Sequence, residues 1–209
     1  MKLSHVLYKV NDLAESVAQF KDRGFQVEYG SKQNPHNALI YFSHGPYVEL
    51  IEKPPVSSFL KVVLMLIGKK FLVDRFNYWE KSKPGYFEIC LENYSHNFKN
   101  EIEYLKKQNQ SFFVTSSHRH DPQNRILKWK LLFPVENRLP FMMTYFNIDP
   151  KPKNFIHPNG VEKIEKVVYG MDKEFIPLLK NICDDNTLSI VEGEGVLDVK
   201  FKSSTKTDP

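Results

Sequence analysis

The chain has 209 residues, of which 41% are hydrophobic and 26% are charged, a composition close to that of an ordinary soluble protein with one sizeable core or two small ones. Its net charge of +4 comes from scattered lysines. A nucleic-acid-binding protein would more often concentrate its basic residues on one helix or loop, so we expect no nucleic-acid partner.

The cysteines and the hydrophobic runs exclude further classes. Cys90 and Cys183 each lie among apolar neighbours, which is typical of small core residues and not of a disulfide framework or a zinc knuckle. The most hydrophobic run, residues 59–68, contains a lysine and is far shorter than the ~20 residues that cross a bilayer. Strand-like alternation begins almost at Met1, where a signal peptide would stand. We therefore expect a cytoplasmic protein with no membrane partner.

Residues 5–30 predict a strand, a helix and a second strand. The first strand alternates, so His5 projects from one face of a sheet. Asn11 or Asp12 supplies the N-cap of the helix, and Gly24 ends it. Two more short strands follow, around a turn at Gly45. The first module, residues 1–55, thus has the order βαβββ.

The pattern changes at residues 56–83, which we expect to be a helical insertion. A helix is predicted from Ser57 to Lys81, with Ser57 or Ser58 as its cap and a break at Gly68. It is apolar nearly all round, so it must bury against something. It either caps one end of a cavity or serves as a dimer contact or a mobile lid.

Residues 84–148 repeat the order of the first module, and a recurring unit outweighs any single strand prediction. Aligning the two repeats places Tyr86 where His5 stands and a residue near Met143 where Glu49 stands.

A third, shortened βαββ module is predicted at residues 161–203, after a proline-rich linker at residues 149–160. Its last two strands are expected to form a hairpin around a turn at residues 192–195. The tail, residues 204–209, is predicted to be disordered.

Several motifs together resemble one family. The stretches HVLYKVNDL, HNALIYF and YVELIE resemble the first module of the glyoxalase-like proteins of the vicinal-oxygen-chelate superfamily. The later stretches WKLLFP, LPFMMTYF and HPNGVEKIEKVV resemble the same proteins in the same order. The resemblance implies an α+β fold in which repeated βαβββ modules form curved mixed sheets, or half-barrels, around an apolar cavity.

The resemblance also implies a divalent metal inside the half-barrel, held by the first and last strands of each module. The first module offers His5 and Glu49, which suit Zn²⁺, Ni²⁺, Fe²⁺ or Mn²⁺. The second offers Tyr86 and Met143, neither of which is a competent ligand for these ions. If modules one and three pair, Glu165 would complete a set with His5 and Glu49. The alternative is that His5 and Glu49 share a hydrogen bond or line an empty pocket.

Other residues are candidates for lining the cavity or its rim. Those expected to line the cavity are His36, Tyr47, Tyr86, Trp129, Met143 and Tyr145. The loop from His118 to Asp121 has the composition of a metal-binding loop, but a polar hairpin loop is the simpler interpretation. Arg119, Arg125 and Lys130 are candidates for contacting an anionic substrate at the rim.

Three functions from different classes follow. The first is a metal-assisted lyase, isomerase or dioxygenase acting on a small oxygenated molecule, with His5 and Glu49 as ligands. The second is a metal-free protein of the same fold that binds or sequesters a small molecule, which the missing ligands of the second module favour. The third is an interaction module that forms a homodimer through the apolar helix, and it is compatible with either of the others.

Overall fold

The computed structural model describes residues 1–54 and 56–204. The tail predicted to be disordered is residues 204–209, of which only Ser204 is described, and its backbone N–H donates to the carbonyl of Gly160 at 2.9 Å; residues 205–209 lie outside the described residues. The elements, in chain order, are β1 Lys2–Lys9, α1 Leu13–Asp22, β2 Glu28–Tyr29, β3 Asn37–Ile40, β4 Tyr47–Ile51, α2 Ser58–Leu66, α3 Lys70–Lys81, β5 Gly85–Asn93, α4 Lys99–Lys107, β6 Phe112–His120, β7 Ile126–Pro134, β8 Phe141–Thr144, β9 Val161–Met171, a 3₁₀ turn at Lys173–Phe175, α5 Ile176–Ile182, β10 Leu188–Glu192 and β11 Gly195–Ser203. No helix in the described part of the chain is both long and apolar enough to span a membrane.

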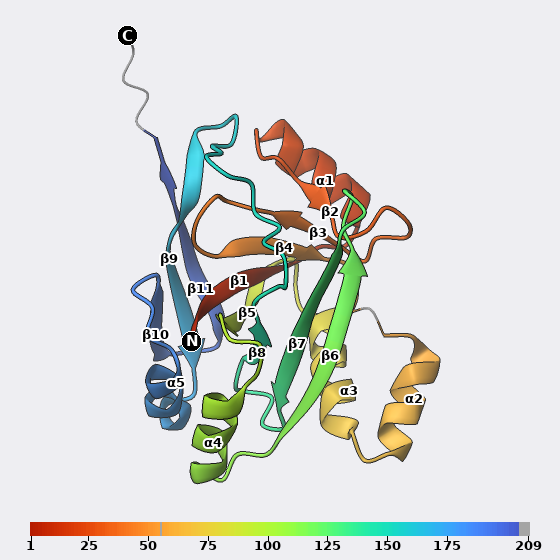
Figure 1. Cartoon of the computed structure of the whole chain (residues 1–209), viewed down its shortest axis with the longest axis vertical. Helices are drawn as coiled ribbons and strands as arrows, with labels where there is room; N and C mark the ends of the chain where they lie inside the picture. Colours follow the sequence, from red (N-terminus) through yellow and green to blue (C-terminus); the bar gives the residue numbers. More distant parts are fainter. Residues whose placement is uncertain (55, 205–209) are drawn as a thin grey trace.

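Eight strands form one curled mixed sheet in the order β2-β3-β4-β1-β5-β8-β7-β6 (Figure 1). Within each half, the first strand runs parallel to the last, β1 beside β4 and β5 beside β8. The halves meet along the antiparallel pair β1 and β5, in which His5 lies opposite Cys90. The α+β fold with half-barrel sheets is therefore confirmed, and the first and second modules are the ones that pair.

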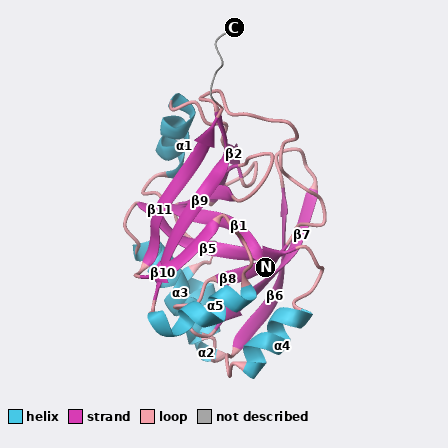
Figure 2. Cartoon of the chain, turned by 90° about the vertical axis from the view of Figure 1, so that its left-hand side faces the viewer, coloured by secondary structure: helices cyan, strands magenta, loops and turns pink. Residues whose placement is uncertain are grey.

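The other three strands form a separate sheet in the order β10-β9-β11 (Figure 2). The predicted hairpin is wrong, because β10 and β11 lie on opposite sides of β9, the former parallel and the latter antiparallel to it. The turn between them crosses β9 at Gly170, where a Cβ atom would lie 2.6 Å from the backbone nitrogen of Glu194. A glycine in β9 thus lets the turn pass where a hairpin would otherwise be expected.

The convex face of the large sheet carries the main core. Val6 of β1 and Val10 just after it pack there with the buried face of α1, as their alternation predicts. The Asp12 side chain accepts a hydrogen bond from the backbone N–H of Glu15 at 2.8 Å and so caps α1. This packing fixes the position of β1 and therefore the direction in which His5 projects.

The concave face is partly filled by the insertion. Leu72, Phe76 and Trp79 of α3 pack against residues of β1, β7 and β8 in a second apolar cluster. By contrast, α2 buries none of its residues, and Gly68, at φ 73°, separates the two helices. The insertion is thus two helices, of which α3 covers one part of the half-barrel.

The two outer edges of the curled sheet are linked by side chains. Arg119 of β6 donates hydrogen bonds to the carbonyl of Gly30, just after β2, and to the Tyr41 hydroxyl, the latter at 3.0 Å. Gln123, in the loop after β6, donates to Glu28 of β2 at 3.2 Å. The first and the last strand of the sheet are therefore brought close together around its interior.

Candidate functional site

His5 and Glu49 meet on the concave face, where β1 and β4 lie side by side. Nε2 of His5 is 3.2 Å from Oε2 of Glu49. His5 is 2% exposed, whereas the Glu49 side chain is 18% exposed. The His5 ring stacks on Tyr47 at 4.7 Å between centroids, and the edge of Phe141 lies at 5.8 Å. The parallel pairing and the two-residue period of the strands bring the two residues together as predicted.

Neighbouring polar groups orient His5. The Ser4 hydroxyl donates to Oε2 of Glu92 at 2.7 Å and lies 3.1 Å from Nδ1 of His5. Because the hydroxyl proton is directed to Glu92, the serine oxygen accepts from Nδ1–H. The Nε2 lone pair then faces Glu49, and within the described residues it has no hydrogen-bond partner.

A second set of contacts orients Glu49. The Asn37 side-chain amide donates to Oε1 of Glu49 at 2.7 Å. Gly30 makes room for that amide, since a Cβ atom there would lie 1.9 Å from Oδ1 of Asn37. Only a glycine at position 30 permits this arrangement.

Burial controls the charges of the pair. Burial, with a smaller contribution from the charge of Lys151, lowers the pKa of His5 to about 3, so the imidazole is neutral at physiological pH. Burial also raises the pKa of Glu49, while the Asn37 hydrogen bond and the Arg119 charge oppose that rise. A lone pair and a carboxylate thus face each other, and a proton or a cation is needed between them.

The pair fits two ligands of one metal ion but does not complete a site. Ligands on bonds of about 2.1 Å, at angles of about 90–109°, are about 3.0–3.4 Å apart, which agrees with the 3.2 Å separation. Glu165, however, is exposed on β9 in the other sheet. Residues 1–54 and 56–204 contain no group of three or more His, Cys, Asp or Glu side chains able to hold a metal. The structure thus does not bring Glu165 to His5 and Glu49.

The structure matches His5 to another residue of the second module than the sequence alignment did. Cys90, and not Tyr86, lies opposite His5. If Met143 corresponds to Glu49, the pairing of β5 with β8 also makes Cys90 the counterpart of His5. Cys90 is fully buried, and burial raises its thiol pKa well above the ordinary value. The second half of a metal site is therefore replaced by a protonated thiol and a thioether.

A cavity of about 900 Å³ lies beside the pair, between the β2–β3 edge, the loop after β6 and the linker. Its walls include the rings of Tyr29, Tyr41 and Phe155, three cations and the carboxylate of Glu28; the cations are Lys32, Arg125 and Lys151. Tyr41 contacts Tyr47 at 4.8 Å, and Tyr47 in turn stacks on His5. Tyr47 thus links Tyr41 of the cavity wall to His5, and Leu39 of the wall pairs with Glu49 across β3 and β4.

The six residues expected to line the cavity lie in different surroundings. Tyr47 stacks on His5, and the sulfur of Met143 lies 3.3 Å from the Ser4 hydroxyl oxygen. Trp129 contacts Phe146, Tyr145 donates to Asp149, Tyr86 packs on Tyr8 at the convex core, and His36 is exposed. The wall of the larger cavity is formed by other residues of the described chain.

Alternate residues of the segment from His118 to Asp121 differ in exposure. His118 and His120 are exposed at the end of β6, while Arg119 points inward and Asp121 is buried against Arg125. Of the three cations suggested for the rim, Arg125 lines the cavity, Arg119 links the sheet edges, and Lys130 is not among the lining residues.

Several functional side chains were missed in the sequence. Ser4 and Glu92 hold His5, Asn37 holds Glu49, and Lys151 borders the cavity. A signal existed for two of these residues. Asn37 directly follows His36, and Lys151 opens the basic segment of the linker.

Comparisons with known proteins agree with this fold. The family model of a glyoxalase-like domain matches residues 3–176. A solved structure of a hypothetical protein from Staphylococcus aureus is similar, with a TM-score of 0.65 and 16% identity, over 100% of this chain and 93% of that one. No match is found among curated proteins. Since the family model covers most of the chain, the protein belongs to the glyoxalase-like domain family.

Proposed function

We propose that the protein binds a small oxygenated anion in the larger cavity without a resident metal. The observation that carries this proposal is the half-buried Lys151 in the cavity wall. Its ammonium donates to the carbonyl of Gly45 at 2.7 Å. An ammonium has three protons to donate, so further donors are available to a ligand.

The charges around the cavity support an anionic ligand. Arg125 is paired with Asp121, but Lys32 and Lys151 still outnumber the single lining carboxylate, Glu28. Burial lowers the pKa of Lys151, although the carboxylates of Glu92 and Asp149 oppose the shift. An anion beside this ammonium would compensate for its partial removal from water.

The shape and walls of the cavity support a small-molecule ligand. About 900 Å³ lies within the range of about 300–1,000 Å³ that is usual for ligand pockets. The rings of Tyr29, Tyr41 and Phe155 offer apolar contact to the carbon skeleton of the ligand. A carboxylate on a small ring or a short chain matches these walls.

A binding role fits this arrangement better than catalysis by the pair. Neither His5 nor Glu49 is among the residues that line the larger cavity, so a ligand held there lies against other side chains. This arrangement supports the second function suggested by the sequence, a metal-free protein that binds or sequesters a small molecule.

A titration of the ligand class tests the proposal. Small carboxylic acids and their neutral amides, matched in shape, are titrated into the protein and followed by NMR. We expect saturable binding of at least one acid and weaker binding of its amide. Equal binding of both, or of neither, contradicts the proposal.

A second candidate is metal-assisted lyase, isomerase or dioxygenase chemistry, favoured by the 3.2 Å separation of His5 Nε2 and Glu49 Oε2. A divalent cation there would polarise a substrate oxygen. His5 and Glu49 would hold it, with Ser4 and Asn37 fixing their orientation.

Elemental mass spectrometry separates the two candidates. The purified protein is dialysed against Zn²⁺, Ni²⁺, Fe²⁺ or Mn²⁺ and compared with the His5→Ala and Glu49→Ala variants. Near-stoichiometric metal that is lost in both variants would replace the metal-free proposal with the second candidate. Substoichiometric metal that is the same in all three proteins supports the metal-free proposal.

A further inference from the structure

A second cavity, of about 350 Å³, lies where α3, β5, the β7–β8 loop and the third module meet. It shares no lining residue with the larger cavity. Its walls include Arg75 and Tyr78 from α3, Glu88 from β5, Asn137 from the β7–β8 loop and Tyr169 from β9. The site is thus built from segments that are far apart in the chain.

Arg75 is a buried cation whose donors are only partly used. It is 1% exposed, and its Nη2 donates to the carbonyls of Pro134, Glu136 and Leu139 at 3.3, 3.3 and 3.0 Å. Its Nε and Nη1 have no hydrogen-bond partner in the part of the chain that the structure describes. A buried guanidinium remains charged, so these donors require an acceptor.

Glu88 offers the complementary acceptor. Its Oε1 accepts from the Tyr169 hydroxyl and from the backbone N–H of Ile89, both at 2.9 Å. Its Oε2 lies 3.8 Å from Nη1 of Arg75, which is an ion pair but is too long for a hydrogen bond. One hydroxyl group of a ligand can accept from Arg75 and donate to Glu88 at this separation.

Asn137 provides a second free acceptor in the cavity wall. Its amide nitrogen donates to the carbonyl of Phe71 at 3.1 Å, and its Oδ1 has no partner within residues 1–54 and 56–204. The cavity wall therefore combines unused donors and unused acceptors with the aromatic rings of Tyr78 and Tyr169.

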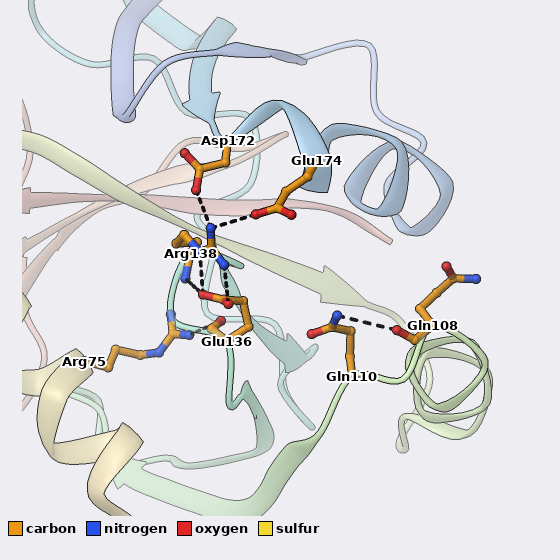
Figure 3. A network of polar contacts seen from close by, with 7 residues as sticks. All are labelled: Arg75, Gln108, Gln110, Glu136, Arg138, Asp172 and Glu174. Carbon is orange, nitrogen blue, oxygen red and sulfur yellow. Dashed lines mark hydrogen bonds and ion pairs between the residues drawn. The ribbon is translucent and has the colours of Figure 1, made fainter.

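Carboxylates outnumber cations at this cavity, where Arg75 and Arg138 face Glu88, Asp172 and Glu194. Arg75 is paired with Glu88, and Arg138 is held by Glu136, Asp172 and Glu174 at 2.7 to 2.8 Å (Figure 3). No cation is left over for an anion, in contrast to the larger cavity. The charges therefore disfavour an anion, and the unused donors of Arg75 and the unused acceptor of Asn137 fit a neutral ligand with adjacent groups that each donate and accept a hydrogen bond.

We propose that this cavity binds a neutral polyhydroxylated molecule of about monosaccharide size. Adjacent hydroxyls both accept from the Arg75 donors and donate to Glu88 and Asn137, and the rings of Tyr78 and Tyr169 contact the carbon skeleton. Water alone can satisfy the same atoms, and the experiment distinguishes the two cases.

The test uses the full chain and ligand-observed NMR. D-ribose, D-glucose and myo-inositol are titrated, with lactate and glycine as charged comparisons. We expect saturable binding of at least one polyol and of neither charged compound at this site. We expect Asn137→Ala to weaken that binding about fivefold, since it removes one neutral hydrogen bond.

A control and a second variant keep the test decisive. Lys151→Met, in the larger cavity, is expected to leave polyol binding unchanged, and Asn137→Ala to leave carboxylate binding unchanged. Tyr78→Ala, partly exposed and at the cavity wall, is a second variant if Asn137→Ala folds poorly, and it too is expected to weaken polyol binding. Failure of every polyol to saturate, or equal affinities in the wild type and the cavity variants, would mean that the cavity holds water only.

Discussion

His5 is a neutral imidazole that is placed to accept at Nε2. Burial and, to a smaller extent, the charge of Lys151 together lower its pKa to about 3, so the ring is uncharged at neutral pH. The Ser4 hydroxyl and the Asn37 amide orient His5 and Glu49 respectively. The chemistry of this pair therefore depends on what lies between the two acceptors.

Asp121 shows how a buried carboxylate links stability to pH. Its oxygens accept from the backbone N–H and the Nε of Arg125, at 2.8 and 2.6 Å. Burial acts to raise its pKa, but the hydrogen bonds from Arg125 outweigh burial and hold the pKa below the ordinary value. A carboxylate with a lowered pKa stabilises the fold above its unfolded pKa, and this contribution is lost as the pH falls through the folded pKa.

We expect Asp121→Asn to lower the free energy of unfolding by about 1–3 kcal/mol at pH 7, the usual contribution of a charged hydrogen bond. Urea unfolding at pH 7 and at pH 3 measures the free energy of unfolding of the variant and of the wild type. The difference between these two free energies should shrink below about pH 4. Glu103→Gln, which removes an exposed ion pair with Lys107, is the control and should leave stability unchanged at both pH values. A cost that is the same at both pH values would contradict the assignment.

The residue scale also shows why part of the site could be predicted. The two-residue period of β1 and β4 placed His5 and Glu49 on the concave face. Ser4 could not be assigned to the same site, because neighbours in a regular strand point to opposite faces. The register shifts between Leu3 and His5, and this irregularity lets Ser4 contact Glu92 and Nδ1 of His5.

At the scale of elements, the two helices of the insertion differ in how much they stabilise the fold. Trp79 of α3 is 6% exposed and lies against Phe141 at 5.0 Å, whereas Phe59 of α2 is 78% exposed. The sequence predicted one apolar helix that packs against other parts of the protein, and α3 is buried in this way. The large exposed side chains of α2 include Phe59, Leu66 and Ile67. A homodimer through α2 stays a prediction, which a mass measurement across dilution tests.

We expect Trp79→Ala to cost about 3–5 kcal/mol of unfolding free energy, the range for truncating a buried large aromatic residue. Phe59→Ala is the matched variant and should change stability by no more than about 0.5 kcal/mol. Chemical denaturation of both variants at low protein concentration measures this. Similar costs in the two variants would show that α2, too, is buried in the folded protein.

Element boundaries were largely predictable because they depend on local signals. The Asp12 cap and the helix break at Gly68 both follow from neighbouring residues. The pairing of strands was less predictable from the sequence. The hairpin expected at residues 192–195 failed because the turn there crosses β9 at Gly170, a contact between distant parts of the chain.

At the scale of the whole molecule, the larger cavity exists because the sheet curls until its two edges meet. Arg119 of β6 contacts Gly30, a residue 89 positions earlier, and Tyr41. Such closure depends on the accumulated curl of eight strands, so local patterns do not encode it. The sequence therefore suggested Arg119 and Arg125 as rim residues without showing which of them lines the cavity.

The cavity also depends on the linker, which places Lys151 opposite the first module. Its ammonium donates to the carbonyl of Gly45, in the turn between β3 and β4. Lys153, two residues later, is exposed and lies outside the lining of the cavity. The two lysines have the same charge, so they separate a direct contact from long-range electrostatics.

The most direct test is the affinity of the tightest-binding small carboxylate for the wild type, Lys151→Met and Lys153→Met, measured by calorimetry at one salt concentration. We expect Lys151→Met to weaken binding about 10- to 100-fold, the loss of a charged hydrogen bond, and Lys153→Met to change it less than about twofold. Equal affinities in the three proteins, or no saturable binding to the wild type, would contradict an anion-binding cavity.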